Sequence, residues 1–296
     1  MLSIHDAFRK FRSRLELTNK EQEDASRRQK DVRRVMDESF DIHRDFLTGS
    51  YARWTKTKPL KDVDIFCILG RSHGDYRSKR PSVLLSDVEK ALAKEFGSEN
   101  VSQQRRSCTV NFGVAAVEDD TGDRVMSFDV VPAFASNGHY EIPDTATVSG
   151  WTRTDPEIHA ERAVNAQKAY DGEWKGLVRM MKKWNNHQDK PIKPSFLIEV
   201  MALEILHPPW GGDYRREMLG FFATLADRID ETWADPAGLG PPVSDRMDAQ
   251  MIAHARRELR DAQSNAELAM RLEREGKNGD ALRAWRKLFG PLFPLS

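Results

Sequence analysis

The feature that most constrains the fold of this chain is the apolar run at residues 62–69, DVDIFCIL, which opens with two aspartates separated by one valine. Its β-branched and aromatic residues are typical of a buried strand. Side chains two positions apart on a strand point to the same face, so Asp62 and Asp64 project together. Neighbouring carboxylates repel each other unless a cation lies between them, and hard oxygen ligands suit Mg2+. The run therefore predicts a strand that begins with a metal site.

A glycine and a serine precede this strand. Gly49 can adopt backbone angles that a residue with a Cβ atom resists, so the amides of a strand-to-helix turn can approach a phosphate group. Ser50 adds a hydroxyl for a phosphate oxygen. The loop at residues 51–61 joins the two elements and carries the basic side chains Arg53, Lys56, Lys58 and Lys61. We interpret these charges as attracting a triphosphate, with simple solvation as the alternative.

A third acidic residue, Asp129, lies in a second apolar run at residues 126–134, MSFDVVPAF, which predicts a neighbouring strand. An unpaired carboxylate buried there would be costly, whereas a metal site shared with Asp62 and Asp64 would satisfy it. An Asp-x-Asp pair alone is more often two solvated residues of an edge strand. In order and spacing, the three acids and the upstream Gly-Ser pair resemble a nucleotidyltransferase site, and this resemblance implies that the three aspartates are catalytic and metal-binding residues.

These motifs resemble those of the polymerase-β-like nucleotidyltransferases in their order and spacing. Two later segments, GLVRMMKKWNNH at residues 176–187 and KPSFLIEVMALEIL at 193–206, narrow the resemblance to the bacterial cyclic GMP-AMP synthase-like nucleotidyltransferases, the signalling enzymes of anti-phage defence. The similarity is clearest over residues 45–206. The Gly-Ser and Asp-x-Asp part is shared with oligoadenylate synthases, CCA-adding enzymes and small antitoxin transferases, so only the combination of motifs favours the signalling branch.

The resemblance implies an α+β fold, in which a mixed catalytic sheet is braced by a long N-terminal helix and covered by a C-terminal helical lobe. We expect the catalytic core at residues 1–154 and the helical lobe at 155–296, with the active site in the cleft between them. Apolar periodicity predicts helices at residues 4–39 (one or two), 82–96, 156–170, 172–187, 194–206, 211–233, 244–275 and 278–288. It predicts strands at residues 45–48, 63–69, 107–117 and 126–132, a hairpin turn at 118–123, and a crossover without regular structure at 137–154.

The resemblance also assigns roles to two residues of the later segments. Lys182 is expected to reach the triphosphate, although from the residues alone a solvated lysine is an equal alternative. Ser195 is expected to supply a second phosphate contact, whereas the sequence alone favours a helix N-cap. The predicted nucleotide-binding residues are therefore Gly49, Ser50, Lys182 and Ser195. The expected cofactors are two Mg2+ ions, with Mn2+ as an alternative.

The activity implied by the resemblance is synthesis of a cyclic di- or trinucleotide from nucleoside triphosphates, with ATP and GTP as the expected substrates. One alternative is a linear-product transferase that acts on RNA or protein. Another is a catalytically silent nucleotide-binding partner in a regulatory assembly, against which the intact set of aspartates argues.

Composition excludes several other classes. Lys and Arg together equal Asp and Glu, 46 each, so the chain lacks the basic excess of a protein that binds a phosphate backbone. Two cysteines are too few for the zinc thumb of the DNA-sensing animal relative, so we do not expect DNA to activate this protein. We expect a protein partner to regulate it instead. No apolar run approaches the about 20 residues that span a bilayer, so we expect a cytoplasmic protein that does not bind membranes.

Overall fold

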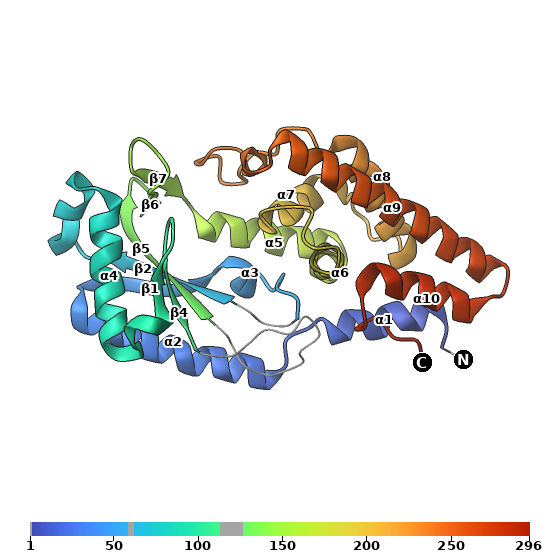
Figure 1. The fold of residues 1–296 in the computed structure, drawn as a ribbon, viewed down its shortest axis with the longest axis horizontal. Coiled ribbons are helices and arrows are strands. Elements are labelled where there is room, and N and C mark those ends of the chain that lie inside the picture. The colour runs from blue at the N-terminus through green and yellow to red at the C-terminus, as the bar shows by residue number, and fades with distance from the viewer. Residues whose placement is uncertain (1, 59–61, 113–126) are drawn as a thin grey trace. The chain divides into compact units, whose positions relative to one another are not determined.

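The structure is a computed structural model that describes residues 2–58, 62–112 and 127–296 (Figure 1). Its Cα positions divide into two compact units. One comprises Leu17–Trp54 and Pro59–Ala160 and is called the sheet unit. The other comprises Met1–Glu16, Thr55–Lys58 and Glu161–Ser296 and is called the helical unit. The domain boundary at residue 154 stays a prediction, because these units describe packing within the chain and not functional domains.

The sheet unit is built on a mixed sheet, which confirms the predicted α+β class. The strands are β1 (Ile42–Thr48), β2 (Asp62–Leu69), β3 (Val101–Gln103), β4 (Cys108–Asn111), β5 (Ser127–Ser136), β6 (His139–Pro143) and β7 (Trp151–Thr154). Their order is β1-β2-β5-β4-β3, with β6 pairing with β5 and β7 pairing with β6. β2 and β5 are parallel, and the other strand pairs among the described residues are antiparallel. The two strands that carry the aspartates are thus central neighbours.

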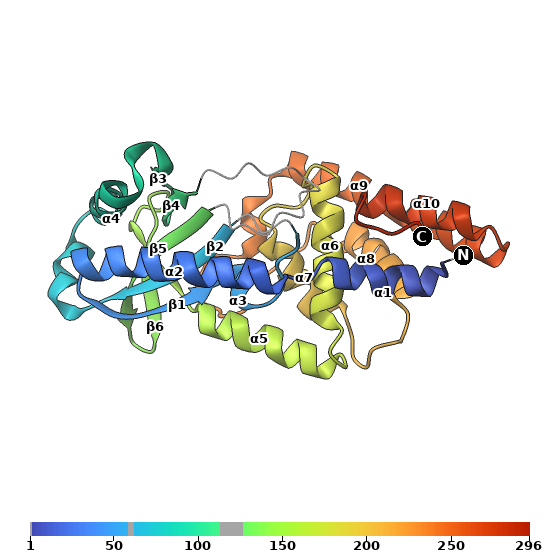
Figure 2. The ribbon, with the colours of Figure 1, turned by 90° about the horizontal axis from the view of Figure 1, so that it is seen from below.

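Alternation along β2 fixes which face of the sheet carries charge. The odd-numbered positions are buried side chains of the core, namely Val63, Ile65, Cys67 and Leu69. They pack with apolar residues of α2 (Asn19–Ser39) and α4 (Pro81–Phe96), two helices of the sheet unit shown in Figure 2. Full burial of such a side chain contributes about 1.5–3 kcal/mol. If β2 shifted by one residue against its neighbouring strands, Asp62 and Asp64 would point into this core. Packing of the core therefore fixes the register of β2 and keeps both aspartates on the opposite face.

The segment predicted as one N-terminal helix or two forms two, α1 (Ile4–Arg14) and α2. The second begins at a capping box, in which the Thr18 side chain accepts from the Glu21 amide and the Glu21 carboxylate accepts from the Thr18 amide. The break between the helices is also where the chain passes from the helical unit to the sheet unit.

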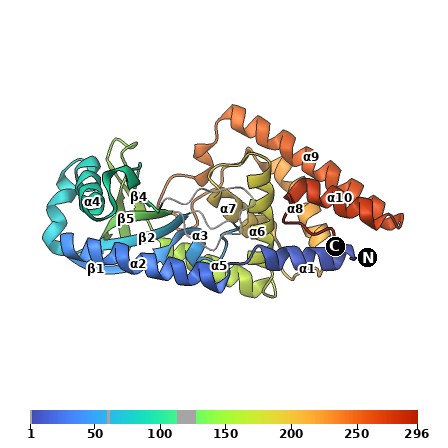
Figure 3. The same ribbon diagram turned by 60° about the horizontal axis from the view of Figure 1, so that its bottom comes forward.

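The helical unit confirms the helices predicted in the second half of the chain. These are α5 (Pro156–Ala169), α6 (Trp174–His187), α7 (Phe196–Ile205), α8 (Tyr214–Arg228), α9 (Ala249–Arg274) and α10 (Asn278–Phe289); α5 begins in the sheet unit. Figure 3 shows α8, α9 and α10 lying beside one another. Helix α1 packs into the same core, where the Phe8 ring lies 4.9 Å from that of Trp285 and 5.2 Å from that of Phe293.

One prediction about the fold is wrong. Residues 137–154, expected as an irregular crossover, contain β6 and β7. Asn137 and Gly138 both have positive φ, 49° and 83°, and form the tight Asn-Gly turn that pairs β5 with β6. The Asn-Gly signal was present in the sequence, but neither strand is long enough to show a period. The hairpin predicted at 118–123 lies outside the described residues.

Across the described ranges, the longest helices are too short or too polar to cross a bilayer. Helix α9, for example, is charged along its length.

Candidate active site

Gly49 lies against the carboxylate of Asp64. The last residue of β1, Thr48, pairs with Asp64 across the antiparallel ladder, and the chain then turns into the single helical turn α3 (Gly49–Ala52). Gly49 has φ +66°, and a Cβ atom there would lie 1.7 Å from Asp64 Oδ2. Both the backbone angle and the close approach therefore require glycine. The turn brings Ser50 to the same end of the sheet, as the Gly-Ser motif predicts.

The strand register places Asp64 beside Asp129. These two residues are Cα partners in the parallel β2–β5 pair, and Asp62 is the partner of Ser127 two positions earlier. Directly opposed residues of a sheet point to one face, so all three aspartates lie on the face opposite the α2–α4 core. All three are described, and they come from two adjacent strands as the sequence predicts.

These carboxylates form an all-oxygen donor set of the kind that Mg2+ and Mn2+ prefer. Among the described residues no three carboxylate, histidine or cysteine side chains converge closely enough to form a ready-made metal site. The strand register thus places the backbones of the three aspartates side by side. Binding of one cation by all three side chains is a proposal. The residues present fit the expected group, because a shared cation would relieve the repulsion between them.

The same face of the sheet becomes apolar one row beyond the aspartates. Phe66 and Ile68 continue the alternation of β2 and are buried with Ala133 and Ile142. The Phe46 ring of β1 lies 5.3 Å from that of Phe66. A dry patch beside the carboxylates lowers the local dielectric, so charges at the site act on one another more strongly than in water.

The cysteines take no part in this chemistry. Cys67 and Cys108 are buried and make no disulfide. Burial raises the pKa of the Cys108 thiol to about 12, and burial also raises the pKa of Cys67. Both thiols are thus protonated at neutral pH and unsuited to act as nucleophiles.

Lys182 and Ser195 lie in the helical unit. Lys182 donates to Glu199 Oε1 at 2.5 Å, and the two side chains are 5% and 2% exposed. The solvated-lysine alternative is therefore wrong: Lys182 is a buried cation held by a buried acid that sequence reasoning did not single out. Ser195 is exposed at the N-cap of α7, but its side chain makes no capping hydrogen bond. Their contacts with a triphosphate stay predictions.

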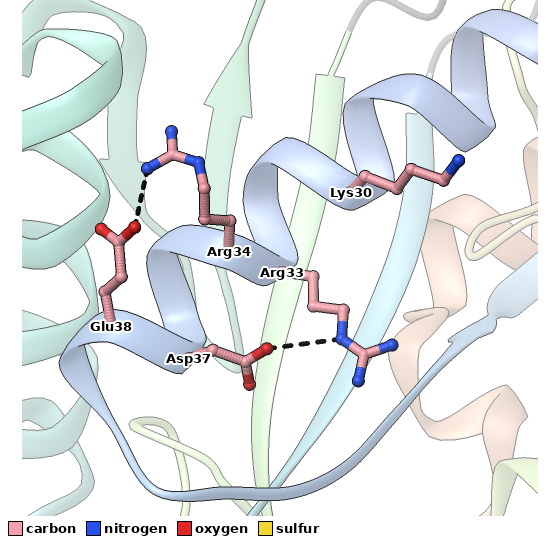
Figure 4. Close-up of a pocket in the computed structure, with 5 residues that line it drawn as sticks. All are labelled: Lys30, Arg33, Arg34, Asp37 and Glu38. Carbon is pink, nitrogen blue, oxygen red and sulfur yellow. Dashed lines mark hydrogen bonds and ion pairs between the residues drawn. The ribbon is translucent and has the colours of Figure 1, made fainter.

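A run of basic residues lies on α2, and its four arginines, Arg27, Arg28, Arg33 and Arg34, each contact an acid on the same helix. Figure 4 shows the shallow pocket that it lines, in which Arg33 contacts Asp37 and Arg34 donates to Glu38. Arg33 also pairs with Asp45 of β1 at 3.0 Å. The hydrogen bonds that Arg34 donates to Glu38 and Glu95 raise the pKa of the Arg34 guanidinium. Arg33 and Arg34 are exposed, although the Asp45 side chain is buried, and the pairs with Asp45 and Glu95 tie α2 to its neighbours. The paired arginines therefore give no evidence of a nucleic-acid site.

Two residues near the site were not anticipated. Trp54 has φ 59° and is 50% exposed, an uncommon conformation for a bulky residue. Thr109 of β4 pairs with Asp129 and donates a hydrogen bond to it. A sequence offers no signal for Thr109, because its neighbour depends on which strands pair and in which register.

Comparison with known proteins places this geometry in a family. The model of the Second Messenger Oligonucleotide or Dinucleotide Synthetase domain, SMODS, matches residues 2–166. The chain belongs to this family. The matched SMODS region contains all of the sheet unit and α1, and with them the three aspartates, Gly49 and Ser50.

Individual relatives of the SMODS family agree with this assignment. A probable cyclic nucleotide synthase of Bacillus cereus is 28% identical over 272 residues, which cover 83% of this chain and 81% of that protein. The cyclic AMP-AMP-AMP synthase of an Acinetobacter species is 26% identical over 288 residues, covering 90% and 78%. The structure of E. coli MS115-1 CdnC in its complex with HORMA-deltaN has the same fold, with a TM-score of 0.72, 19% identity and 98% of each chain covered. The predicted membership among cyclic GMP-AMP synthase-like nucleotidyltransferases is confirmed, and the chain is a nucleotidyltransferase.

We predict that Gly49→Ala both destabilises the protein and impairs its activity. The left-handed backbone costs about 1–2 kcal/mol for a residue with a Cβ atom, and the new methyl group displaces the Asp64 carboxylate. Gly238→Ala is the matched control, because Gly238 has φ +67° with open space around its Cβ position. Thermal unfolding should shift in both variants, while nucleotide incorporation should fall only in Gly49→Ala. Equal activity of the two variants would contradict the close packing at Asp64.

We also predict that the double substitution Asp62→Asn and Asp64→Asn abolishes nucleotide incorporation without loss of stability. Removing two like charges relieves repulsion in the metal-free protein, so its melting temperature should stay the same or rise. Calorimetry and a radiolabelled-nucleotide assay give the two readouts. Asp75→Asn, on the exposed 3-10 helix Arg71–Ser78, is the control and should retain activity. If the double variant turns over at the wild-type rate at saturating Mg2+, the assignment of Asp62 and Asp64 to the active site is wrong.

Proposed function

We propose that this enzyme joins nucleoside triphosphates into a cyclic di- or trinucleotide, using two divalent cations held by Asp62, Asp64 and Asp129. The observation that carries the proposal is the register pairing of Asp64 with Asp129 beside Gly49 in a SMODS-family sheet. ATP is the first candidate substrate, because a relative that covers most of this chain is named a cyclic AMP-AMP-AMP synthase. GTP is the second.

Each residue has a distinct role in this proposal. When bound, Mg2+ ions would neutralise the triphosphate and favour ionisation of the attacking ribose hydroxyl. Asp62 and Asp64 would hold the donor side of the site, and Asp129 would orient the acceptor hydroxyl toward the α-phosphorus. The Gly49 turn and the Ser50 hydroxyl would bind the β- and γ-phosphates. Positioning and charge neutralisation are sufficient for such a transfer, so no covalent nucleophile is required.

We further propose a regulated role in antiviral signalling within the bacterial cytoplasm. The neighbour CdnC was solved in complex with a HORMA protein, which supports a protein partner as the regulator of this chain also. Stimulation by DNA is not expected, since the chain has balanced charge and only two cysteines.

The decisive experiment incubates the purified chain with labelled ATP and GTP in Mg2+ and then treats the products with phosphatase. A cyclic product keeps its label, because it has no terminal phosphate. Asp129→Asn should make no product yet bind the donor nucleotide as wild type does, since Asp129 acts on the acceptor. A phosphatase-sensitive product would instead indicate a linear-product transferase, and binding without any product would indicate a regulatory nucleotide-binding protein.

Substitutions in the phosphate-binding residues should separate binding from chemistry. Ser50→Ala removes one hydrogen bond to a charged group, worth about 1.5–3 kcal/mol, and should weaken donor binding roughly tenfold to hundredfold. Lys182→Met is tested together with Glu199→Gln, so that no buried charge is left unpaired. This pair should weaken donor binding similarly and leave the maximal rate at saturating nucleotide nearly unchanged. Lys168→Met, near the end of α5, is the control. If the Lys182 variant binds the donor nucleotide as tightly as the wild type, the proposed phosphate contacts of Lys182 and Ser195 are wrong.

A further inference from the structure

Asp129 is held by a neighbour on the strand beside it. β4 pairs with β5 so that Thr109 is the Cα partner of Asp129, and both side chains lie on the face of the aspartates. The Thr109 hydroxyl donates to Asp129 Oδ1 at 2.5 Å. An ionised carboxylate can only accept, so the hydroxyl is necessarily the donor. Hydrogen bonds from a hydroxyl to a carboxylate are short and strong, and this one fixes the orientation of the carboxylate.

The contact belongs to a row of residues that crosses four strands. In order across the sheet the row is Thr109, Asp129, Asp64 and Thr48. Gly49 follows Thr48 and lies against Asp64. The two central carboxylates are therefore restrained from opposite sides, Asp64 by the close approach of a glycine and Asp129 by a hydrogen bond from β4.

The local sequence suits Thr109 to this task. Cys108 and Val110, on either side of it, are both fully buried and keep β4 in register with β5. A β-branched side chain on a strand has few χ1 rotamers, so the hydroxyl loses little freedom when it binds the carboxylate. The alternation of buried and half-buried positions thus aims the Thr109 side chain at Asp129.

We propose that Thr109 is a positioning residue for nucleotidyl transfer, whose hydroxyl holds the Asp129 carboxylate in the orientation that binds the cation and the acceptor hydroxyl. The inference rests on the proposed role of Asp129. Groups that orient metal-ligating side chains typically contribute about 10–100-fold to metal affinity or activity. Because Thr109 acts through Asp129, its loss should lower the maximal rate more than the affinity for the donor nucleotide.

The test compares Thr109→Val, which keeps the shape but removes the donor, with Thr109→Ser, which keeps the donor. Thr152→Val on β7 is the matched control, because Thr152 is a half-buried strand threonine like Thr109 but pairs with Ile142 of β6 instead of an aspartate. We expect Thr109→Val to lower kcat about 10–100-fold with less than a threefold change in donor KM, and Thr109→Ser to stay within a few-fold of wild type. The control should match wild type.

A second readout does not depend on turnover. Mn2+ binding to the full chain with a non-hydrolysable ATP analogue, followed by electron paramagnetic resonance, should weaken about 10-fold or more in Thr109→Val. In an Asp129→Asn background the same substitution should change Mn2+ affinity little, because the group that it orients is already altered. A merely structural threonine would instead lower the melting temperature equally in both backgrounds.

The outcomes separate this inference from the proposed function. If Asp129→Asn is inactive while Thr109→Val keeps the wild-type rate and Mn2+ affinity, the positioning role is wrong and the proposed function stands. Equal impairment of Thr109→Val and Thr109→Ser would also overturn it, since the serine keeps the donor. If Asp129→Asn itself retains full turnover, the proposed site and the inference fail together.

Discussion

The placement of three carboxylates on one face of a seven-stranded sheet is the constraint on which the rest of this structure depends. Chain folding has to place these charges next to one another before any cation is present. The opposite face supplies the driving force, because β2 buries Val63, Ile65, Cys67 and Leu69 against α2 and α4. Without that core face, the register of β2 with β5 would no longer be fixed, and Asp64 would no longer be held opposite Asp129. Hydrophobic packing on one face of the sheet therefore fixes where the three carboxylates lie on the other.

The sequence predicted this central arrangement because the chemistry and the periodicity agree in it. The apolar run after Asp62 indicated a buried strand, the spacing indicated a common face, and Gly49 indicated a turn that only glycine permits. The structure adds the reason for that glycine, which is the position of Asp64 Oδ2. Most helices were predicted as well, since they carry several turns of apolar periodicity. At the start of α5 a capping residue adds to this signal, because Asp155 accepts from the amides of Glu157 and Ile158.

What the sequence could not predict depends on contacts between distant segments. β6 and β7 are too short to show alternation, and they become strands only because β5 offers an edge. The Glu199 partner of Lys182 and the Thr109 partner of Asp129 lie 17 and 20 residues away in sequence. Asp144 is fully buried yet accepts hydrogen bonds from both Arg105 and Arg106, which join the β3–β4 turn to the end of β6. Such pairs follow from strand order, which local patterns do not contain.

The place of α1 in the helical unit has a consequence for how the protein forms. Phe8 packs against Trp285 and Phe293, and Lys10 donates to the carbonyl of Ser296, so the first and last segments share one core. In sequence, the sheet unit lies between Met1–Glu16 and Glu161–Ser296 of the helical unit, and Thr55–Lys58 of the helical unit interrupts it. During synthesis all of the sheet unit has been made once residue 160 has emerged, whereas α1 can pack against α10 only after residue 289. Until then the apolar face of α1 cannot be buried in that core, and contacts between segments so far apart in sequence are in general slow to form.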